Sequence, residues 1–95
     1  MEVRRTERFA RWLDGLRDIR ARARILVRIE RLASGNPGDV SPIGEGVSEM
    51  RIHCGPGYRV YFKQCGDVLV VLLAGGDKRS QFRDVRQALA LARGL

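Results

Sequence analysis

The segment from residue 46 to residue 78 constrains the fold most, because its pattern predicts three short strands joined by two tight turns. Polar and apolar residues alternate over 47–54, which is typical of a half-buried strand. The alternation resumes over 58–64, after the turn-forming triplet Gly55-Pro56-Gly57. A third run, 68–74, follows a Gly-Asp turn and is apolar throughout, which indicates a central strand covered on both faces. The following pair of glycines is expected to end this strand.

Polar side chains of the first two strands would share one face of the sheet if the strands pair in register. They are Arg51, His53, Arg59, Tyr61 and Lys63. Four basic or potentially basic groups beside a tyrosine form a surface suited to phosphate. Charged residues on one face of a meander are more often its solvated face, so both interpretations stand. The basic character of this face and the pair Lys78-Arg79 beyond the third strand favour phosphate binding.

Apolar residues at helical spacing predict three helices. The first follows Thr6 and the second follows Asp18, since both side chains can cap a helix. The third begins after Asp77 or Ser80 and ends at Gly94. The apolar positions are Phe9, Trp12, Leu13 and Leu16 in the first helix, Ile25, Leu26, Ile29, Leu32 and Ala33 in the second, and Val85, Ala88, Leu89 and Ala92 in the third.

These elements predict an α+β fold, in which two N-terminal helices pack on an antiparallel β-sheet and a C-terminal helix follows. Residues 3–5 are expected to add an edge strand, and residues 35–46 are expected to form a loop. The second helix carries the arginines at positions 20, 22, 24, 28 and 31. They form either a nucleic-acid-binding stripe or the solvated side of the helix. We favour the solvated side, because Glu30 lies among them.

The charge of the chain predicts polyanionic partners. Its 95 residues carry 18 Lys and Arg against 11 Asp and Glu, a formal net charge of +7, and sixteen of the basic residues are arginine. Nucleic acid or an acidic protein would fit this excess, and the solubility of a small basic protein is the alternative. The length predicts a single domain, 1–95. The absence of a long apolar run and of a signal-peptide pattern predicts a cytoplasmic protein without a membrane span.

Cofactor motifs and metal-ligand spacings are absent from the sequence. Cys54 and Cys65 are the only cysteines and His53 is the only histidine, so no metal site and no cofactor are expected. Neither a phosphate-binding glycine loop nor a nucleophile motif occurs. A lone histidine is more often a surface residue than a catalyst, but His53 lies on the basic strand face and remains a candidate acid or base.

Five strings, taken jointly, resemble the RelE/ParE superfamily of toxins from toxin–antitoxin modules, and within it the HigB-like "addiction module killer protein" group. The resemblance covers nearly the whole chain. It implies a microbial RNase-like toxin fold and a RelE-like activity, which is to enter the ribosomal A site and cut messenger RNA. The strings are Phe9–Trp12–Leu13, Ser34 to Asp39, Glu49 to Ile52, Gly55 to Tyr61, and Gly75 to Lys78.

The resemblance also implies where the site lies. Basic residues on the sheet are matched by Arg51 and Arg59, and a basic residue after the last strand is matched by Lys78 or Arg79. Many RelE-like proteins carry a tyrosine on the last helix or tail. This chain has Phe82 near that place, which lacks a hydroxyl and departs from the acid–base scheme of the family.

The implied reaction is attack of a ribose 2′-hydroxyl on the adjacent phosphate, and it assigns a role to each candidate. Arg59 and Lys78 are expected to stabilise the negative charge of the transition state. Proton transfer is assigned to His53 and Tyr61. The remaining basic residues, Arg51, Arg79 and Lys63, are expected to bind the flanking RNA. Because Arg59 lies mid-strand on the polar face, its replacement is expected to spare the fold.

The implied partners are the ribosome with its messenger RNA and a HigA-like helix-turn-helix antitoxin, whose complex would bind operator DNA. This antitoxin either covers the basic face or grips the toxin elsewhere, and the HigB-like resemblance favours the second arrangement. Two other functions remain open on the same fold. One is a ParE-like inhibitor of DNA gyrase without nuclease activity, and the other is a nucleic-acid-binding module without catalysis.

Overall fold

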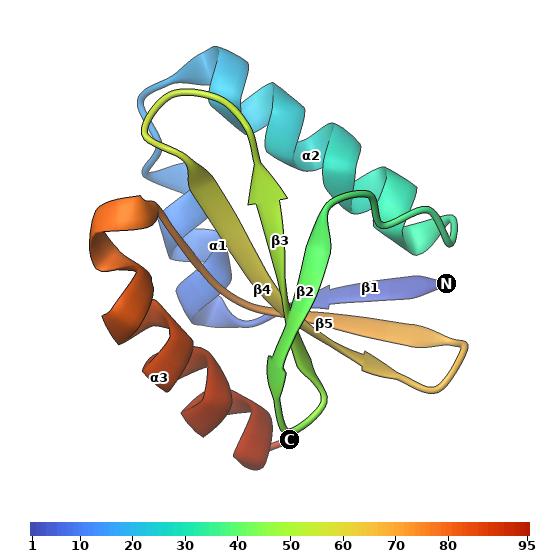
Figure 1. Ribbon diagram of the computed structural model, residues 1–95. Helices are drawn as coiled ribbons and strands as arrows, with labels where there is room; N and C mark the ends of the chain where they lie inside the picture. The colour runs from blue at the N-terminus through green and yellow to red at the C-terminus, as the bar shows by residue number, and fades with distance from the viewer.

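Five strands form one mixed sheet in the order β1-β5-β4-β3-β2 in the computed structural model, which describes residues 1–95 (Figure 1). The predicted meander is its main part, since β3 (Val47–Ile52), β4 (Tyr58–Cys65) and β5 (Leu69–Gly76) pair antiparallel in chain order. The predicted edge strand is β1 (Glu2–Arg5), and it runs parallel to β5. This one parallel pair makes the sheet mixed, where the sequence predicted an antiparallel one.

The segment predicted to be a loop contains the second edge strand, β2 (Val40–Gly44), which pairs antiparallel with β3. Its turn to β3 runs through Gly44, Glu45 and Gly46, all of which have positive φ. Glycine adopts such φ values at little cost, which explains two of the three residues. The loop prediction was wrong because β2 contains Pro42 and ends in glycine, residues that sheets tolerate mainly at their edges.

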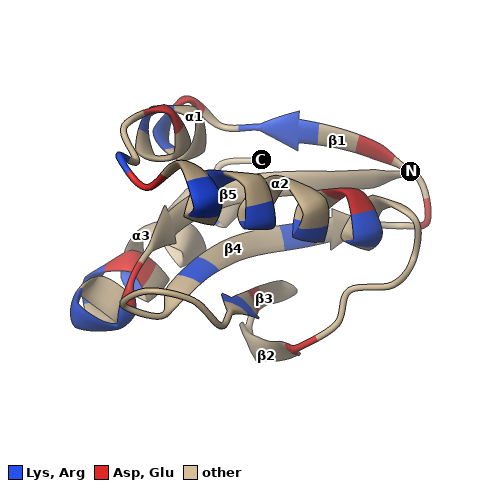
Figure 2. Ribbon diagram, turned by 90° about the horizontal axis from the view of Figure 1, so that it is seen from above, with Lys and Arg blue, Asp and Glu red and all other residues tan.

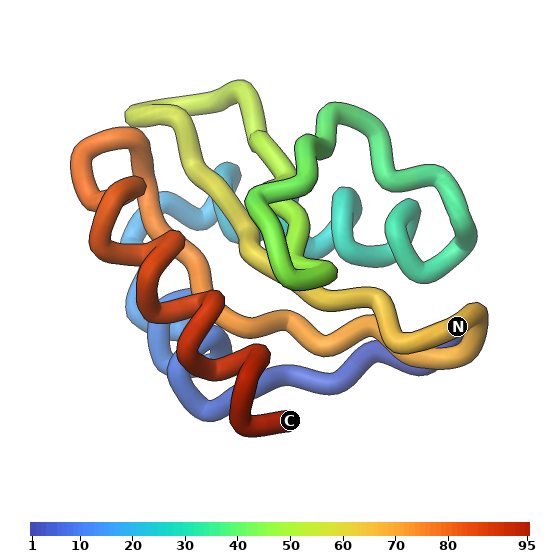
Figure 3. Tube along the Cα trace, turned by 60° about the horizontal axis from the view of Figure 1, so that its bottom comes forward, coloured from blue at the N-terminus to red at the C-terminus, as the bar shows by residue number.

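Helices cover both faces of the sheet. On one face lie α1 (Glu7–Asp14), which packs mainly on β5, and α2 (Ile19–Ala33), which packs on β3. On the other lies α3 (Gln81–Arg93), which follows a short 3₁₀ turn, η1 (Lys78–Ser80) (Figure 3). None of these helices is long and apolar enough to cross a membrane.

The side chains that start the helices are those the sequence indicated. The Thr6 hydroxyl accepts a hydrogen bond from the Phe9 backbone N–H, and the Asp18 carboxylate accepts one from Ala21. Of the two candidates before the last helix, Asp77 caps the 3₁₀ turn η1, because its carboxylate accepts from the backbone N–H groups of residues 79 and 80. Ser80 occupies the N-cap position of α3 and makes no side-chain capping hydrogen bond. The three caps satisfy donors that would otherwise be unpaired at the starts of α1, α2 and η1.

The apolar strand β5 is central, as its sequence predicted, and it contributes to two hydrophobic cores. Val70 and Leu72 face α1 and α2, whereas Val71 and Leu73 face α3. Both faces of β5 are therefore buried, which accounts for a continuous apolar run where the neighbouring strands alternate.

The glycine pair at the end of β5 continues the strand instead of ending it. A Cβ on Gly75 would lie 2.1 Å from the Trp12 ring on one face, and a Cβ on Gly76 would lie 1.8 Å from the carboxylate of Asp84 on the other. The two glycines thus let α1 and α3 approach the same strand from opposite sides. This close approach fixes the start of α3 against the sheet.

Leu72→Ala should strongly destabilise the fold, because Leu72 is fully buried in the core beneath α1 and α2. Truncation of a buried leucine costs about 2–5 kcal/mol, which in a domain of this size lowers the melting temperature by about 10 °C or more. Val68→Ala, at an exposed position before the same strand, is the matched control. A melting temperature within a degree or two of wild type for Leu72→Ala would show that β5 is not central.

Candidate functional site

The candidate site lies on the sheet face that α3 partly covers, where β3 and β4 pair in the predicted register. Arg51 lies opposite Arg59, and Glu49 lies opposite Tyr61. Basic positions mark β3, β4 and the beginning of the C-terminal helical segment at this end of the molecule (Figure 2). The alternation in the sequence therefore assigned these side chains to the correct face.

A buried carboxylate stands at the centre of this face. Glu49 is only 4 % exposed, and its oxygens lie 3.3 Å from Arg51 Nη1 and 3.4 Å from Arg59 Nε. The side-chain amide of Gln81, at the start of α3, donates to the other oxygen over 2.9 Å. The sequence predicted a basic face, but this face also contains a buried carboxylate. Because an unpaired buried charge is costly, Glu49 fixes both guanidinium groups in place.

Arg59 is correspondingly well held. Its side chain is only 13 % exposed, and its Nη1 donates to the carbonyl of Gly57 over 3.2 Å. Its buried Nε lies 3.4 Å from Glu49 in an ion pair and makes no hydrogen bond. The prediction that replacement of Arg59 spares the fold stays a prediction, but the removal of Arg59 would leave the buried Glu49 with fewer partners. The sequence did not reveal this, because the burial of Glu49 depends on how α3 lies over the strands.

A second carboxylate, Asp39, links Arg51 to His53. Arg51 binds it with two nitrogens, Nη2 at 2.5 Å and Nε at 3.1 Å, and His53 Nε2 lies 2.5 Å from Asp39 Oδ2. The hydrogen bond from Arg51, and then that from His53, hold the pKa of the Asp39 carboxyl well below its usual range. The same contact raises the pKa of Arg51. Asp39 immediately precedes the unrecognised strand β2, so its role was missed.

Lys78 and Arg79 lie in η1, directly beyond β5, and both are exposed. A Cβ on Gly57 would lie 3.8 Å from both Arg59 Nη1 and Lys78 Cβ. Arg59 and Lys78 therefore both lie against the β3–β4 turn. Arg79 lies 3.4 Å from the Asp77 carboxylate, whereas no carboxylate pairs with Lys78.

Phe82 stands out among the aromatic side chains because it is 83 % exposed. It lies on the first turn of α3, in a shallow hollow that it shares with Lys78, Arg79 and Arg86. An aromatic ring exposed among cations offers a surface on which a nucleobase can stack while its phosphates meet the charges.

Two of the predicted site residues are not at this surface. Tyr61 is fully buried, its hydroxyl has no hydrogen-bond partner, and burial, followed by the proximity of Glu49, raises the pKa of the phenol. Lys63 lies four residues further along β4, opposite Val47 and next to the β2–β3 turn. The structure therefore brings together the basic groups of residues 51, 53, 59, 78 and 79, and leaves Tyr61 in the core.

Acid should weaken the fold partly through Asp39. Because the pKa of this carboxyl is lower in the folded state than its usual value of about 3.9, the contribution of Asp39 is complete above that pH and is lost as the pH falls below it. Unfolding by urea between about pH 5 and pH 2 should show a smaller acid loss in Asp39→Asn than in wild type. Identical pH dependence in the two proteins would contradict the assigned contacts.

Arg59→Ala should lower the free energy of unfolding by about 1–3 kcal/mol, because it leaves the buried Glu49 carboxylate less well compensated. The double variant Arg59→Ala/Glu49→Gln should recover part of this loss, since it removes the charge as well. Urea denaturation of the single and double variants measures both effects. Simple additivity of the two single substitutions would show that Glu49 and Arg59 do not interact.

Comparison with known proteins adds two matches. No family model matches the sequence. A protein of Haemophilus influenzae, described as "Uncharacterized protein", is 46 % identical over 95 residues, which cover 100 % of this chain and 96 % of that protein. A mutant of E. coli toxin RelE in the free state superposes with a TM-score of 0.73 at 17 % identity, over 93 % of each chain. The second match confirms the predicted RelE-like fold.

Proposed function

Because the chain belongs to the same family as the Haemophilus influenzae protein and has the fold of RelE, we propose that it is a toxin of a toxin–antitoxin module. Its action is to stop translation by cutting messenger RNA on the ribosome, as in the HigB-like group that its sequence resembles. The observation that carries the proposal is that the guanidinium of Arg59 and the side chain of Lys78 both lie against the β3–β4 turn at Gly57, at one end of the sheet.

The arrangement of these cations suits the charge that develops in the reaction. When a 2′-hydroxyl attacks the neighbouring phosphorus, negative charge accumulates on the phosphoryl oxygens and the 5′-oxygen departs. Cations that are already in place stabilise this charge without reorganisation. Arg59 is held by Glu49 and the Gly57 carbonyl, and Lys78 lies beside it without a competing carboxylate. Arg51 and Arg79 bind the flanking backbone.

His53 is the proposed proton carrier. One ring nitrogen is bound to Asp39, which orients the imidazole, and the side chain is largely exposed. The other ring nitrogen is then free to take the proton from the 2′-hydroxyl or to give one to the departing 5′-oxygen. Tyr61 is not assigned this role, because its hydroxyl is buried. The ribosome supplies much of the positioning of the messenger.

The proposed partners are the ribosome with its messenger RNA and a HigA-like helix-turn-helix antitoxin. A net charge of +7 favours fast, salt-sensitive association with an acidic antitoxin. We place the antitoxin outside the face formed by Arg51, Arg59 and Lys78, so that it blocks entry to the ribosome by its bulk. Operator DNA is bound through the antitoxin.

Lys78→Ala is the variant that tests this function, because the exposed Lys78 makes no ion pair that the fold needs. Induced expression of the wild type should arrest growth and leave messenger RNA cut at ribosome-protected positions. Lys78→Ala should be folded and lose most of both effects, whereas Arg17→Ala, the loss of an equally exposed cation elsewhere, should keep them.

Three results would count against the proposal. Full toxicity of Lys78→Ala at normal expression would remove Lys78 from the site. Arrest with intact messenger RNA and induced DNA damage would instead identify a ParE-like gyrase inhibitor. Binding of RNA without arrest or cleavage would leave only a nucleic-acid-binding module.

A further inference from the structure

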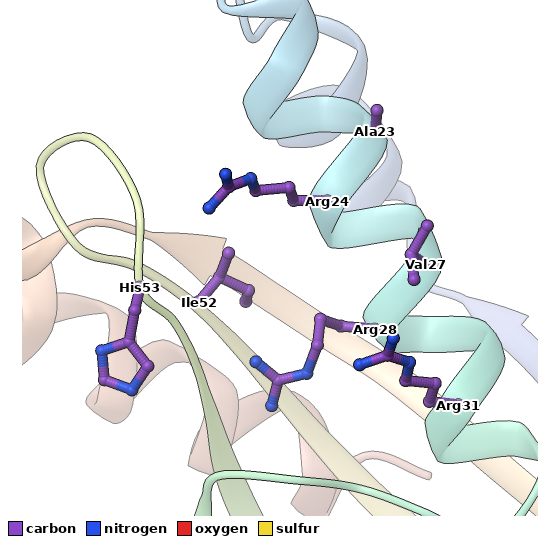
Figure 4. Close-up of a pocket in the computed structure, with 7 residues that line it drawn as sticks. All are labelled: Ala23, Arg24, Val27, Arg28, Arg31, Ile52 and His53. Carbon is purple, nitrogen blue, oxygen red and sulfur yellow. The ribbon is translucent and has the colours of Figure 1, made fainter.

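A groove between α2 and the end of β3 borders the site described above and shares His53 with it (Figure 4). It has a volume of about 410 Å³, and its lining includes Arg24, Val27, Arg28, Arg31, Ile52 and His53. Figure 4 shows Arg24 and Arg28 extending from α2 across the groove towards the strand that carries Ile52 and His53. Arg28 is held across the groove by hydrogen bonds, whereas Arg24 and Arg31 are exposed as expected of the solvated side of the helix.

The charge in this groove is not compensated. None of the lining residues is acidic. Arg28 donates to two neutral acceptors, the carbonyls of Arg51 at 2.6 Å and Pro37 at 3.1 Å, which fix the guanidinium and leave its charge free. Arg24 and Arg31 are exposed and make no ion pair. The nearest carboxylate in contact with the lining is Asp39, which is occupied by Arg51 and His53.

The groove adjoins the candidate site around the edge of the sheet. His53 lines the groove and, through Asp39, is linked to the guanidinium of Arg51 on the other face. Arg28, from the groove side, binds the backbone carbonyl of the same Arg51. Basic side chains therefore extend from Arg59 and Arg51, which pair with Glu49 and Asp39, past His53 to the arginines of α2.

We propose that this groove is a second binding subsite for single-stranded RNA, which takes up the nucleotides next to those at the cleavage site. Phosphates bind Arg24 and Arg31, and a base lies against the apolar surface of Val27 and Ile52. The inference rests on the proposed function in taking RNA as the ligand.

Three observations favour RNA over an acidic protein segment. The cations on α2 are all arginines, and a planar guanidinium can both form two hydrogen bonds to a phosphate and stack on a base. The apolar surface is small, enough for the face of one base and not for the row of side chains that an amphipathic helix would bury. The arginines of α2 also adjoin the candidate cleavage site through His53, which lines the groove. A volume of a few hundred Å³ suits a nucleotide.

Binding of RNA oligonucleotides of two lengths tests the subsite. In a Lys78→Ala background, which prevents cleavage, an RNA of about ten nucleotides spans both sites and one of about three occupies a single site. Arg24→Glu/Arg31→Glu should weaken binding of the longer RNA at least about tenfold, and its salt dependence should flatten by about 1.4 in log–log slope, for two phosphates. Arg17→Glu/Arg20→Glu, an equal charge change outside the groove, is the control.

Amide chemical shifts locate the bound RNA directly. The longer RNA should shift the resonances of residues 23–31 and 52–53, and the short RNA should leave them largely unchanged when it is bound at the cleavage site. If the glutamate variant is unfolded by circular dichroism, Arg24→Ala/Arg31→Ala replaces it, with a smaller expected loss of affinity.

Several outcomes would overturn the proposal. One is an equal loss of RNA affinity in the control variant, and another is an unchanged RNA affinity in the groove variant. A third is displacement of RNA from these residues by a polyglutamate peptide, which would assign the groove to an acidic protein. Failure of the proposed function is a separate result. If the protein binds RNA through the groove but does not cut messenger RNA on the ribosome, the subsite proposal stands and the proposed nuclease function fails.

Discussion

The burial of one carboxylate, Glu49, is the constraint on which the arrangement of the candidate site depends. It lies between the sheet and α3, where it contacts Arg51 and Arg59 from the strands and Gln81 from the helix. A charge at this depth is tolerable only with such partners. The contacts of Glu49 therefore link α3 to the strands through Gln81. They also pair its carboxylate with the guanidinium groups of Arg51 and Arg59. An exposed array of arginines would have neither property.

The two glycines at the end of β5 also help to position the site, because they have no side chain and let the helices pack closely on the strand. Gly76 leaves the space that the buried Asp84 occupies, and Asp84 in turn accepts a hydrogen bond from the Ser80 hydroxyl. The chain between them carries Lys78 and turns tightly into α3. The position of Lys78 relative to Arg59 is thus set by packing on both sides of the strand end, and not by the local sequence of η1 alone.

Much of this structure follows from local patterns. Alternation in β3 and β4 and the apolar run of β5 predicted the meander, and the side chains of Thr6 and Asp18 predicted two helix starts. What was missed depends on contacts between distant residues. The strand β2 has the composition of a loop and is stabilised by pairing with β3. Alternation placed Tyr61 on the polar face, but only the position of α3 shows that this face is covered there.

The acidic members of the site were hidden for the same reason. Asp39 and Arg51 are twelve residues apart, and their contact exists because β2 and β3 pair. If Glu49 positions the cations of the proposed cleavage site, the loss of its charge should slow the cleavage of ribosome-bound messenger RNA, and the cleavage rate of Glu49→Gln measures this effect. The account predicts a folded protein that cuts much more slowly than wild type, because the guanidinium groups lose their charged anchor. An unchanged rate in Glu49→Gln, or a wild-type protein that leaves the messenger intact, would contradict it.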